Sequence, residues 1–134
     1  MRSGGVHWLA VIAAAIAIYA IGFVIYGVLV SEETMMAMTG MTESEKAIAT
    51  ARLTFSPLMP ILTAVFMAIL FKWGSVDSAA KGVKWAVVLA MASAVPAMLY
   101  GWVYGGLDSN MTLIDAAHLL LGHAAAGAIL GGWK

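Results

Sequence analysis

Long apolar stretches dominate the pattern of hydrophobic and polar positions along the chain. Polar residues gather between these stretches, above all in the segment 31–55. A membrane-spanning helix needs about 20 apolar residues, and four stretches come close to that length: 8–30, 57–73, 84–105 and 112–133. The pattern predicts an all-α polytopic membrane protein, with four transmembrane helices in one small bundle over residues 1–134.

Capping and turn residues set the expected ends of these helices. Ser56 precedes Pro57, so the second helix should begin there with the serine as its cap. Thr112 is the expected cap of the fourth helix. Pro96 lies inside the third helix and cannot donate to the carbonyl of Ala92, which predicts a kink.

The segment 31–55 is too polar to span a membrane, and we expect it to lie along the surface as an interfacial loop. Thr42 and Glu45 form the pattern of a capping box, which predicts a short helix from that point. Three methionines recur at every third position: Met35, Met38 and Met41. This spacing favours the apolar face of an interfacial helix, and it leaves a weak copper candidate because thioethers suit Cu(I).

The distribution of basic residues predicts the orientation of the helices. One side of the membrane would carry five of them, at positions 2, 72, 81, 84 and 134, against Lys46 and Arg52 on the other. Because cytoplasmic loops are enriched in lysine and arginine, both termini should be cytoplasmic and the segment 31–55 external. The first apolar run is about 23 residues, longer than the ~7–15 of a signal peptide, so we interpret it as a retained helix.

Composition supports a lipid environment. The chain has 63% hydrophobic and 10% charged residues, whereas soluble domains have about 25% charged residues. The net charge is zero, so the composition gives no sign of the basic surface that a nucleic-acid-binding protein needs. Cysteine is absent, which excludes disulfides and thiolate chemistry.

Small residues at four-residue spacing are the expected contacts between helices, since lipid does not drive apolar helices together. The third helix has such a stripe at Ser93, Ala97, Gly101 and Gly105, and the fourth has one at His123, Gly127 and Gly131. These stripes predict either a tight bundle or contact with another protein. The sequences after Trp8 and Trp85 are also weakly alike, which is compatible with a parallel duplication of a two-helix unit and with chance.

The chain also resembles a known family. The stretch "VHWLAVIAAAIAIYAIGFVIYG", the following "MTGMTESE" and the ending "AGAILGGW" are similar to the bacterial family called domain of unknown function 1761. The resemblance covers nearly the whole chain and implies a four-helix protein of the inner membrane. It implies no activity, and therefore no catalytic residues.

The last helix carries three ionisable residues in an apolar setting: Asp115, His118 and His123. Counted from Thr112, Asp115 should lie in the first turn, where the helix dipole favours a carboxylate. Two other interpretations stay open for Asp115. One is a proton relay with His118, three residues on, and the other is an ion pair with Arg52.

We expect Arg52 within salt-bridge reach of Asp115 or Asp108, since all three lie at the outer ends of helices. His123 should lie near the bilayer centre, with its ring N–H donating to the Ala92 carbonyl. Its small neighbours leave room for a flat ring, so a chlorophyll-type pigment on His123 is a second interpretation. No other cofactor is expected.

The pattern favours two classes of function. The chain has no nucleophile–base pair, phosphate loop or metal-ligand cluster, so we do not expect an enzyme. The first class is a structural or accessory subunit that packs against other membrane subunits or a second copy. The alternative is a small transporter or channel with Asp115 and His118 in a polar path. The scarcity of polar residues in the first two helices favours the first class.

Overall fold

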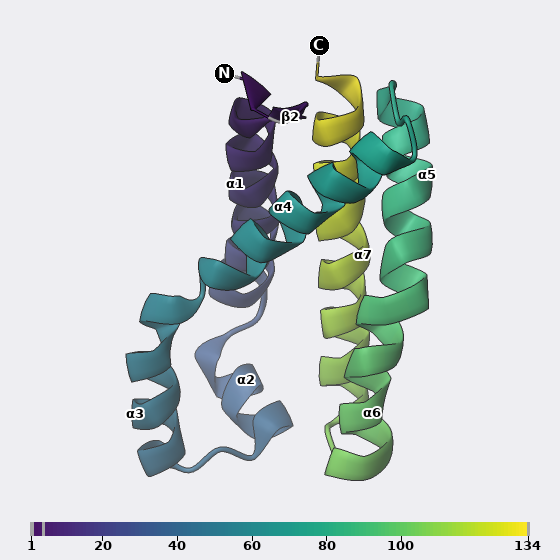
Figure 1. The fold of residues 1–134 in the computed structure, drawn as a ribbon. Helices are drawn as coiled ribbons and strands as arrows, with labels where there is room; N and C mark the ends of the chain where they lie inside the picture. The colour runs from purple at the N-terminus through teal and green to yellow at the C-terminus, as the bar shows by residue number, and fades with distance from the viewer. Residues whose placement is uncertain (1, 4, 134) are drawn as a thin grey trace.

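The structure is a computed structural model that describes residues 2–3 and 5–133. The chain runs through β1 (Arg2–Ser3), β2 (Val6–His7), α1 (Trp8–Val24), the π-helical turn η1 (Ile25–Leu29), α2 (Glu32–Thr39), α3 (Glu43–Arg52), the 3₁₀ turn η2 (Leu53–Phe55), α4 (Leu58–Trp73), α5 (Ala79–Leu89), the π-helical turn η3 (Ala90–Ala94), α6 (Val95–Gly105) and α7 (Ser109–Gly132). Figure 1 shows α1 and α5 along α7, with α4 crossing them obliquely. The β1–β2 end and the C-terminal end of α7 lie at the same end of the molecule.

Three helical segments are long and apolar enough to cross a membrane: Trp8–Leu29, Ala79–Gly105 and Ser109–Gly132. They confirm the all-α fold and supply candidates for three of the four expected spans. The fourth expected span, α4, has 16 residues and would measure about 24 Å, short of the ~30 Å of a hydrocarbon core. It reaches span length only together with the preceding helix Glu43–Phe55, across a bend of 41°.

The start of α7 corrects the expected cap at Thr112. The helix begins three residues earlier, at Ser109, and the side chain of Asp108 accepts hydrogen bonds from the amides of Asn110 and Met111. Gly106 ends α6 in the left-handed conformation, with φ +68°, which leaves Asp108 in position to cap the next helix. Asp115 therefore lies in the second turn of α7, where the helix dipole acts on it less than expected.

Two further helix ends differ from expectation. Ser56 does not cap α4, because its backbone is helical, with φ −58° and ψ −32°, and Pro57 takes the N-cap position. The Ser56 hydroxyl is instead hydrogen-bonded to the Tyr19 hydroxyl at 3.3 Å. The helix expected at 84 begins at Ala79, because Ser78 caps it by accepting from the Lys81 amide.

The structure accommodates Pro96 with a π-helical turn. In η3 the Val95 amide bonds to the Ala90 carbonyl, five residues back, and Pro96 then lies in the first turn of α6. A first turn needs no amide donor, so Ala79–Gly105 continues as one helical segment of 27 residues. The irregularity expected at Pro96 is thus taken up by the preceding turn.

The backbones of α5 and α7 meet at Gly82 and Gly127. A Cβ atom at Gly82 would lie 2.0 Å from the Gly127 carbonyl oxygen, and one at Gly127 would lie 2.5 Å from the Gly82 carbonyl oxygen. One helical turn on, a Cβ at Gly131 would lie 2.5 Å from the Ser78 carbonyl oxygen. Only glycine allows this approach, so these two helices form the closest helix pair in the fold.

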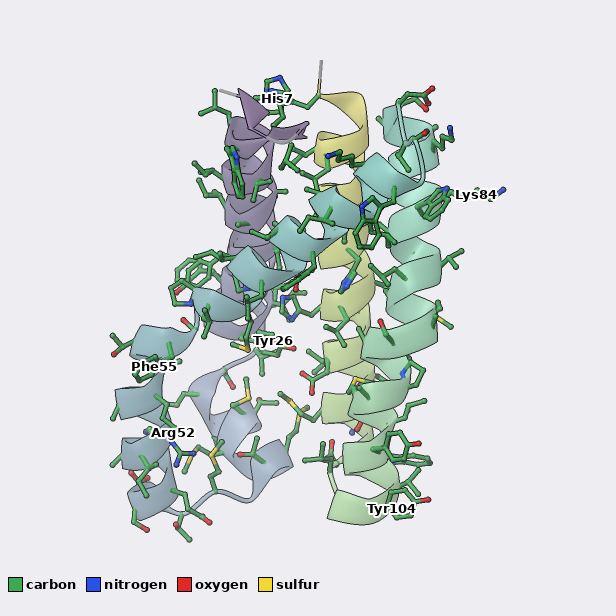
Figure 2. The ribbon with its side chains drawn as sticks, viewed as in Figure 1. His7, Tyr26, Arg52, Phe55, Lys84 and Tyr104 are labelled. Atoms are coloured by element: carbon green, nitrogen blue, oxygen red, sulfur yellow. The ribbon has the colours of Figure 1, made fainter. Side chains whose placement is uncertain are left out.

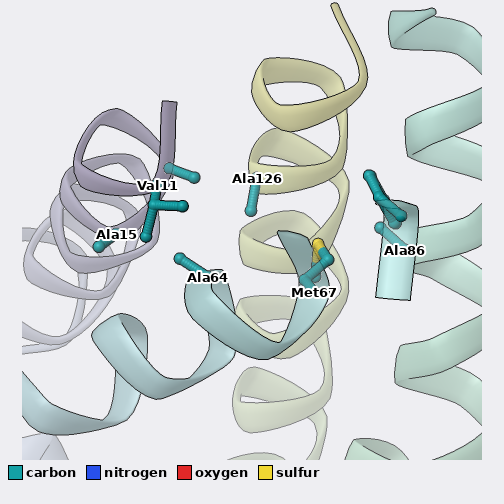
Figure 3. Close-up of a cluster of buried hydrophobic side chains, with 8 residues drawn as sticks. Val11, Ala15, Ala64, Met67, Ala86 and Ala126 are labelled. Carbon is teal, nitrogen blue, oxygen red and sulfur yellow. The ribbon is translucent and has the colours of Figure 1, made fainter. Parts of the chain in front are cut away.

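The apolar core lies near the end of the molecule that carries both chain ends, and it is built mainly from alanine. Figure 3 shows α1, α4, α5 and α7 meeting there. The buried cluster contains Val11, Ala14, Ala15, Ala64, Met67, Phe71, Ala86 and Ala126. In contrast, α6 contains no buried residue, so the far half of the α5–α7 layer has little cover from its own chain.

The segment 31–55 folds into two short helices, as its capping signals predict. Ser31 caps α2, and Gly40 ends it with φ +63°. Thr42 and Glu45 form the expected capping box at the start of α3. An ion pair between Glu32 and Lys46 joins the two helices. Neither helix contains a buried residue, which agrees with a surface position.

We predict that Gly82→Ala destabilises the fold, because the added Cβ would collide with the α7 backbone. Overpacking of this kind costs roughly 1–3 kcal/mol. Thermal unfolding in detergent measures the loss. The matched control is Gly105→Ala, whose Cβ would have no atom within 4 Å and which should change stability by less than about 0.5 kcal/mol. Equal effects of the two substitutions would contradict the close approach.

We also predict that acid loosens the start of α3. The Thr42 amide and hydroxyl donate to the Glu45 carboxylate and hold its pKa below the usual 4.5. A lowered pKa in the folded state stabilises the cap above the unfolded value, and this contribution is lost as pH falls through the folded value. The Thr42 amide resonance, followed by NMR in micelles, should shift over that range. In Glu45→Gln, which keeps the capping geometry without a titrating group, it should stay constant.

Candidate functional site

A polar cluster of three side chains joins the end of α1 to α7. The Tyr26 hydroxyl donates a hydrogen bond of 2.5 Å to Oδ1 of Asp115. The Tyr26 ring also meets the His118 ring edge to face, with centroids 5.2 Å apart and planes at 90°. We call Tyr26, Asp115 and His118 the polar cluster.

The local fold places each member of the polar cluster. Tyr26, which is labelled in Figure 2, lies in the π-helical turn η1. Turns of this kind are frequent at functional sites. Asp115 and His118 are three residues apart and share one face of α7. Gly22 of α1 leaves room for the imidazole, since a Cβ there would lie 2.9 Å from His118 Nε2.

The polar cluster is half-buried, and its hydrogen bonding is internal. The Asp115 carboxylate is satisfied by a hydroxyl donor of the same chain, which reduces the cost of a carboxylate in an apolar layer. This bond ties α1 to α7 beyond the end of the alanine core. Asp115 therefore has a neutral hydrogen-bond partner that the sequence did not indicate: Tyr26, whose ring also contacts His118.

Arg52 does not join this cluster. Among the residues described, it forms no ion pair with Asp115 or Asp108, contrary to expectation. Figure 2 shows Arg52 on α3, and Figure 1 shows α3 standing apart from α7. The bend between α3 and α4 turns α3 away from the bundle, and Arg52 is exposed on it, so its charge does not need a buried partner.

His123 is buried, with 9% of its surface exposed, as its small-residue stripe predicts. Its Nδ1 lies 2.7 Å from the Leu119 carbonyl of the same helix. A carbonyl only accepts, so Nδ1 carries the proton and donates it. This bond replaces the one expected to the Ala92 carbonyl on the third helix, because a carbonyl one turn back lies within reach without any movement between helices.

Side chains from other helices pack against the glycines near His123. A Cβ at Gly122 would meet Ile18 at 3.4 Å, and one at Gly127 would meet the Ala86 Cβ at 2.5 Å. Gly122 and Gly127 therefore pack against Ile18 of α1 and Ala86 of α5. A chlorophyll-type pigment on His123 stays a prediction from the sequence.

The small-residue stripes divide into two kinds. Gly127 and Gly131 are buried against α5, so the stripe of the fourth helix packs inside the bundle. In the third helix, Ser93, Ala97 and Gly105 are exposed, and a Cβ at Gly101 would lie 2.7 Å from the Leu107 side chain. This second stripe therefore faces away from the rest of the chain.

The methionines of the segment 31–55 are distributed over two hollows. Met35, Met36 and Met41 line a cavity of about 370 Å³ between the end of α1 and the α2–α3 pair. Met38 borders a different, open hollow next to Asp108. Among the described residues, no group of three histidine, aspartate or glutamate side chains could hold a metal ion.

Two features of the site were missed in the sequence. The contact between Tyr26 and Asp115 cannot be found in the sequence, because the distance between the two side chains depends on the fold. The second is the stripe at Ser78, Gly82, Ala86 and Ala90, which has the same four-residue spacing as the stripes that were noticed. Ser78 and Gly82 lie outside the helix 84–105 that the sequence predicts, so the apolar pattern does not indicate this stripe.

The long apolar helices and the lipid-compatible surface define the class: a small helical protein built for a membrane. The chain belongs to the family described as "Protein of unknown function (DUF1761)", whose model matches residues 9–131. This match confirms the resemblance seen in the sequence. Comparisons with curated proteins and with solved structures gave no match.

We predict that Tyr26→Phe destabilises the protein, because it removes the donor to Asp115 and leaves a half-buried carboxylate without this partner. Hydrogen bonds between membrane helices contribute roughly 0.6–2 kcal/mol. Unfolding in detergent measures the difference. Tyr104→Phe is the matched control, since Tyr104 is 79% exposed. Equal stability of the two variants would show that the bond between α1 and α7 does not hold the cluster together.

Proposed function

We propose that the protein is a structural or accessory subunit of a larger membrane complex. In this proposal four helices, including α4, cross the bacterial inner membrane, and both termini are cytoplasmic. The distribution of lysine and arginine supports the orientation. The arrangement of the chain ends in Figure 1, at one end of the molecule, is compatible with it.

The observation that carries the proposal is the uncovered face of the helical segment Ala79–Gly105. α6 has no buried residue, and Ser93, Ala97 and Gly105 form an exposed small-residue stripe along η3 and α6. We call these three residues the outer stripe. Apolar helices in lipid associate through close packing at small residues rather than through the hydrophobic effect. The outer stripe therefore offers a partner helix a face of small side chains on which to pack.

The alternative function is a small transporter or channel. The polar cluster supports it, but this cluster occupies only one depth along the bundle. A transport path would have to continue from His118 past His123 to the other end. Along α7 in that direction come Gly127 and Gly131, packed directly on the α5 backbone, and the alanine core fills the space between α1, α4 and α7. The geometry therefore supports the accessory role better, and the proposed role needs no catalytic activity.

The proposal predicts that Ala97→Phe releases the protein from its complex. The phenyl ring would hold a partner helix away from the outer stripe. Native mass spectrometry of the protein extracted from its own membranes in a polymer nanodisc measures the mass of the complex. We expect the wild-type chain to be found with other subunits or further copies, and the variant as a monomer.

Leu99→Phe is the control on the same helix. Leu99 is 39% exposed and lies about 200° around the helix from Ala97, so an aromatic ring there should leave the complex intact. A wild-type chain that is monomeric in its own membrane would contradict the accessory role. Equal loss of the complex in both variants would place the contact elsewhere on the chain.

A further inference from the structure

Methionine is concentrated in one short part of the chain. Four of the ten methionines fall within residues 35–41. The fold brings three of them, Met35, Met36 and Met41, to the wall of the 370 Å³ cavity, together with Tyr26 at the end of α1. Met38, from the same segment, borders another hollow. The fold therefore determines which methionines line the cavity. The regular three-residue spacing in the sequence would instead include Met38 and omit Met36.

The donor atoms of this cavity suit a soft cation. Thioethers are soft ligands, which favour Cu(I) over the harder divalent ions. The chain has no cysteine. The carboxylate among the lining residues, Glu32, is already paired with Lys46. A hard cation would need several free oxygen ligands, and this lining supplies mainly sulfur and apolar groups.

We propose that Met35, Met36 and Met41 bind a Cu(I) ion in this cavity. Each thioether sulfur donates a lone pair to the metal, and the ion keeps its oxidation state, so no proton or electron has to leave. Methionine has three rotatable side-chain bonds, which allow sulfurs from α2 and from the α2–α3 turn to converge on one ion. The site is separate from the outer stripe. It adjoins the polar cluster, because Tyr26 belongs to that cluster and also lines the cavity.

The α2–α3 pair is built to hold such a site at the surface. Ser31 fixes the start of α2, the capping box at Thr42 and Glu45 fixes the start of α3, and the Glu32–Lys46 ion pair joins the two helices. Met41 lies between Gly40, which ends α2, and Thr42. The backbone on both sides of Met41 is therefore held in place, and the exposed helices leave the cavity open to ions from outside.

The competing explanation is that these methionines only supply an apolar lining. Substitution by leucine separates the two, because leucine keeps nearly the same volume and apolar character but has no sulfur. The test uses the full chain in detergent, with Cu(I) supplied in competition with the chelator bathocuproine disulfonate. We expect Met35→Leu, Met36→Leu and Met41→Leu each to weaken Cu(I) binding, by on the order of 10-fold or more, as changes around metal sites commonly do.

Met38→Leu is the matched control, and it should bind Cu(I) within about twofold of the wild type, a change smaller than 0.5 kcal/mol. X-ray absorption of the Cu(I)-loaded protein adds a second readout, and it should show a shell of sulfur ligands that shrinks in each single variant. The proposal fails if the wild-type chain does not compete with the chelator. It fails equally if Met38→Leu weakens binding as much as the other three, or if the shell contains only nitrogen and oxygen.

Discussion

The direct contact between the backbones of α5 and α7 is the constraint on which the rest of the fold depends. With no side chain between Gly82 and Gly127, α7 has a fixed depth and rotation relative to α5. That rotation turns Ala126 into the alanine core shared with α1 and α4. It also sets which face of α7 carries Asp115 and His118 toward the end of α1, where Tyr26 meets them.

The two ends of the bundle consequently differ in character. Near the chain ends, four helices pack through glycine and alanine, and the space between them is filled. At the other end α4 and α3 turn away, α6 has no buried residue, and polar side chains take over the contact between α1 and α7. The filled end is the reason that we propose the accessory role rather than a continuous polar path. The open end supplies the surfaces on which both the accessory role and the copper site are proposed.

Much of the fold could be predicted because it depends on local patterns. Apolar stretches predicted three of the candidate spans, and the Thr42 capping box is present as expected. The predictions that failed required knowledge of distance between helices. Arg52 was paired with carboxylates by depth alone, but the bend of 41° before α4 carries it away from α7. His123 was paired with a neighbouring helix, although a carbonyl of its own helix was closer. Tyr26 could not be assigned to Asp115 because 89 residues separate them.

A double-mutant cycle between Gly82 and Gly127 tests the central claim most directly. Alanine is introduced at each position alone and at both together, and the free energy of unfolding is measured in the same detergent. If the two backbones touch, the first Cβ already separates the helices, so the double variant should lose clearly less stability than the sum of the single losses. Residues in contact typically show such coupling of about 0.5–3 kcal/mol. Additive losses would contradict the account, because they would mean that the two glycines act at independent places in the fold.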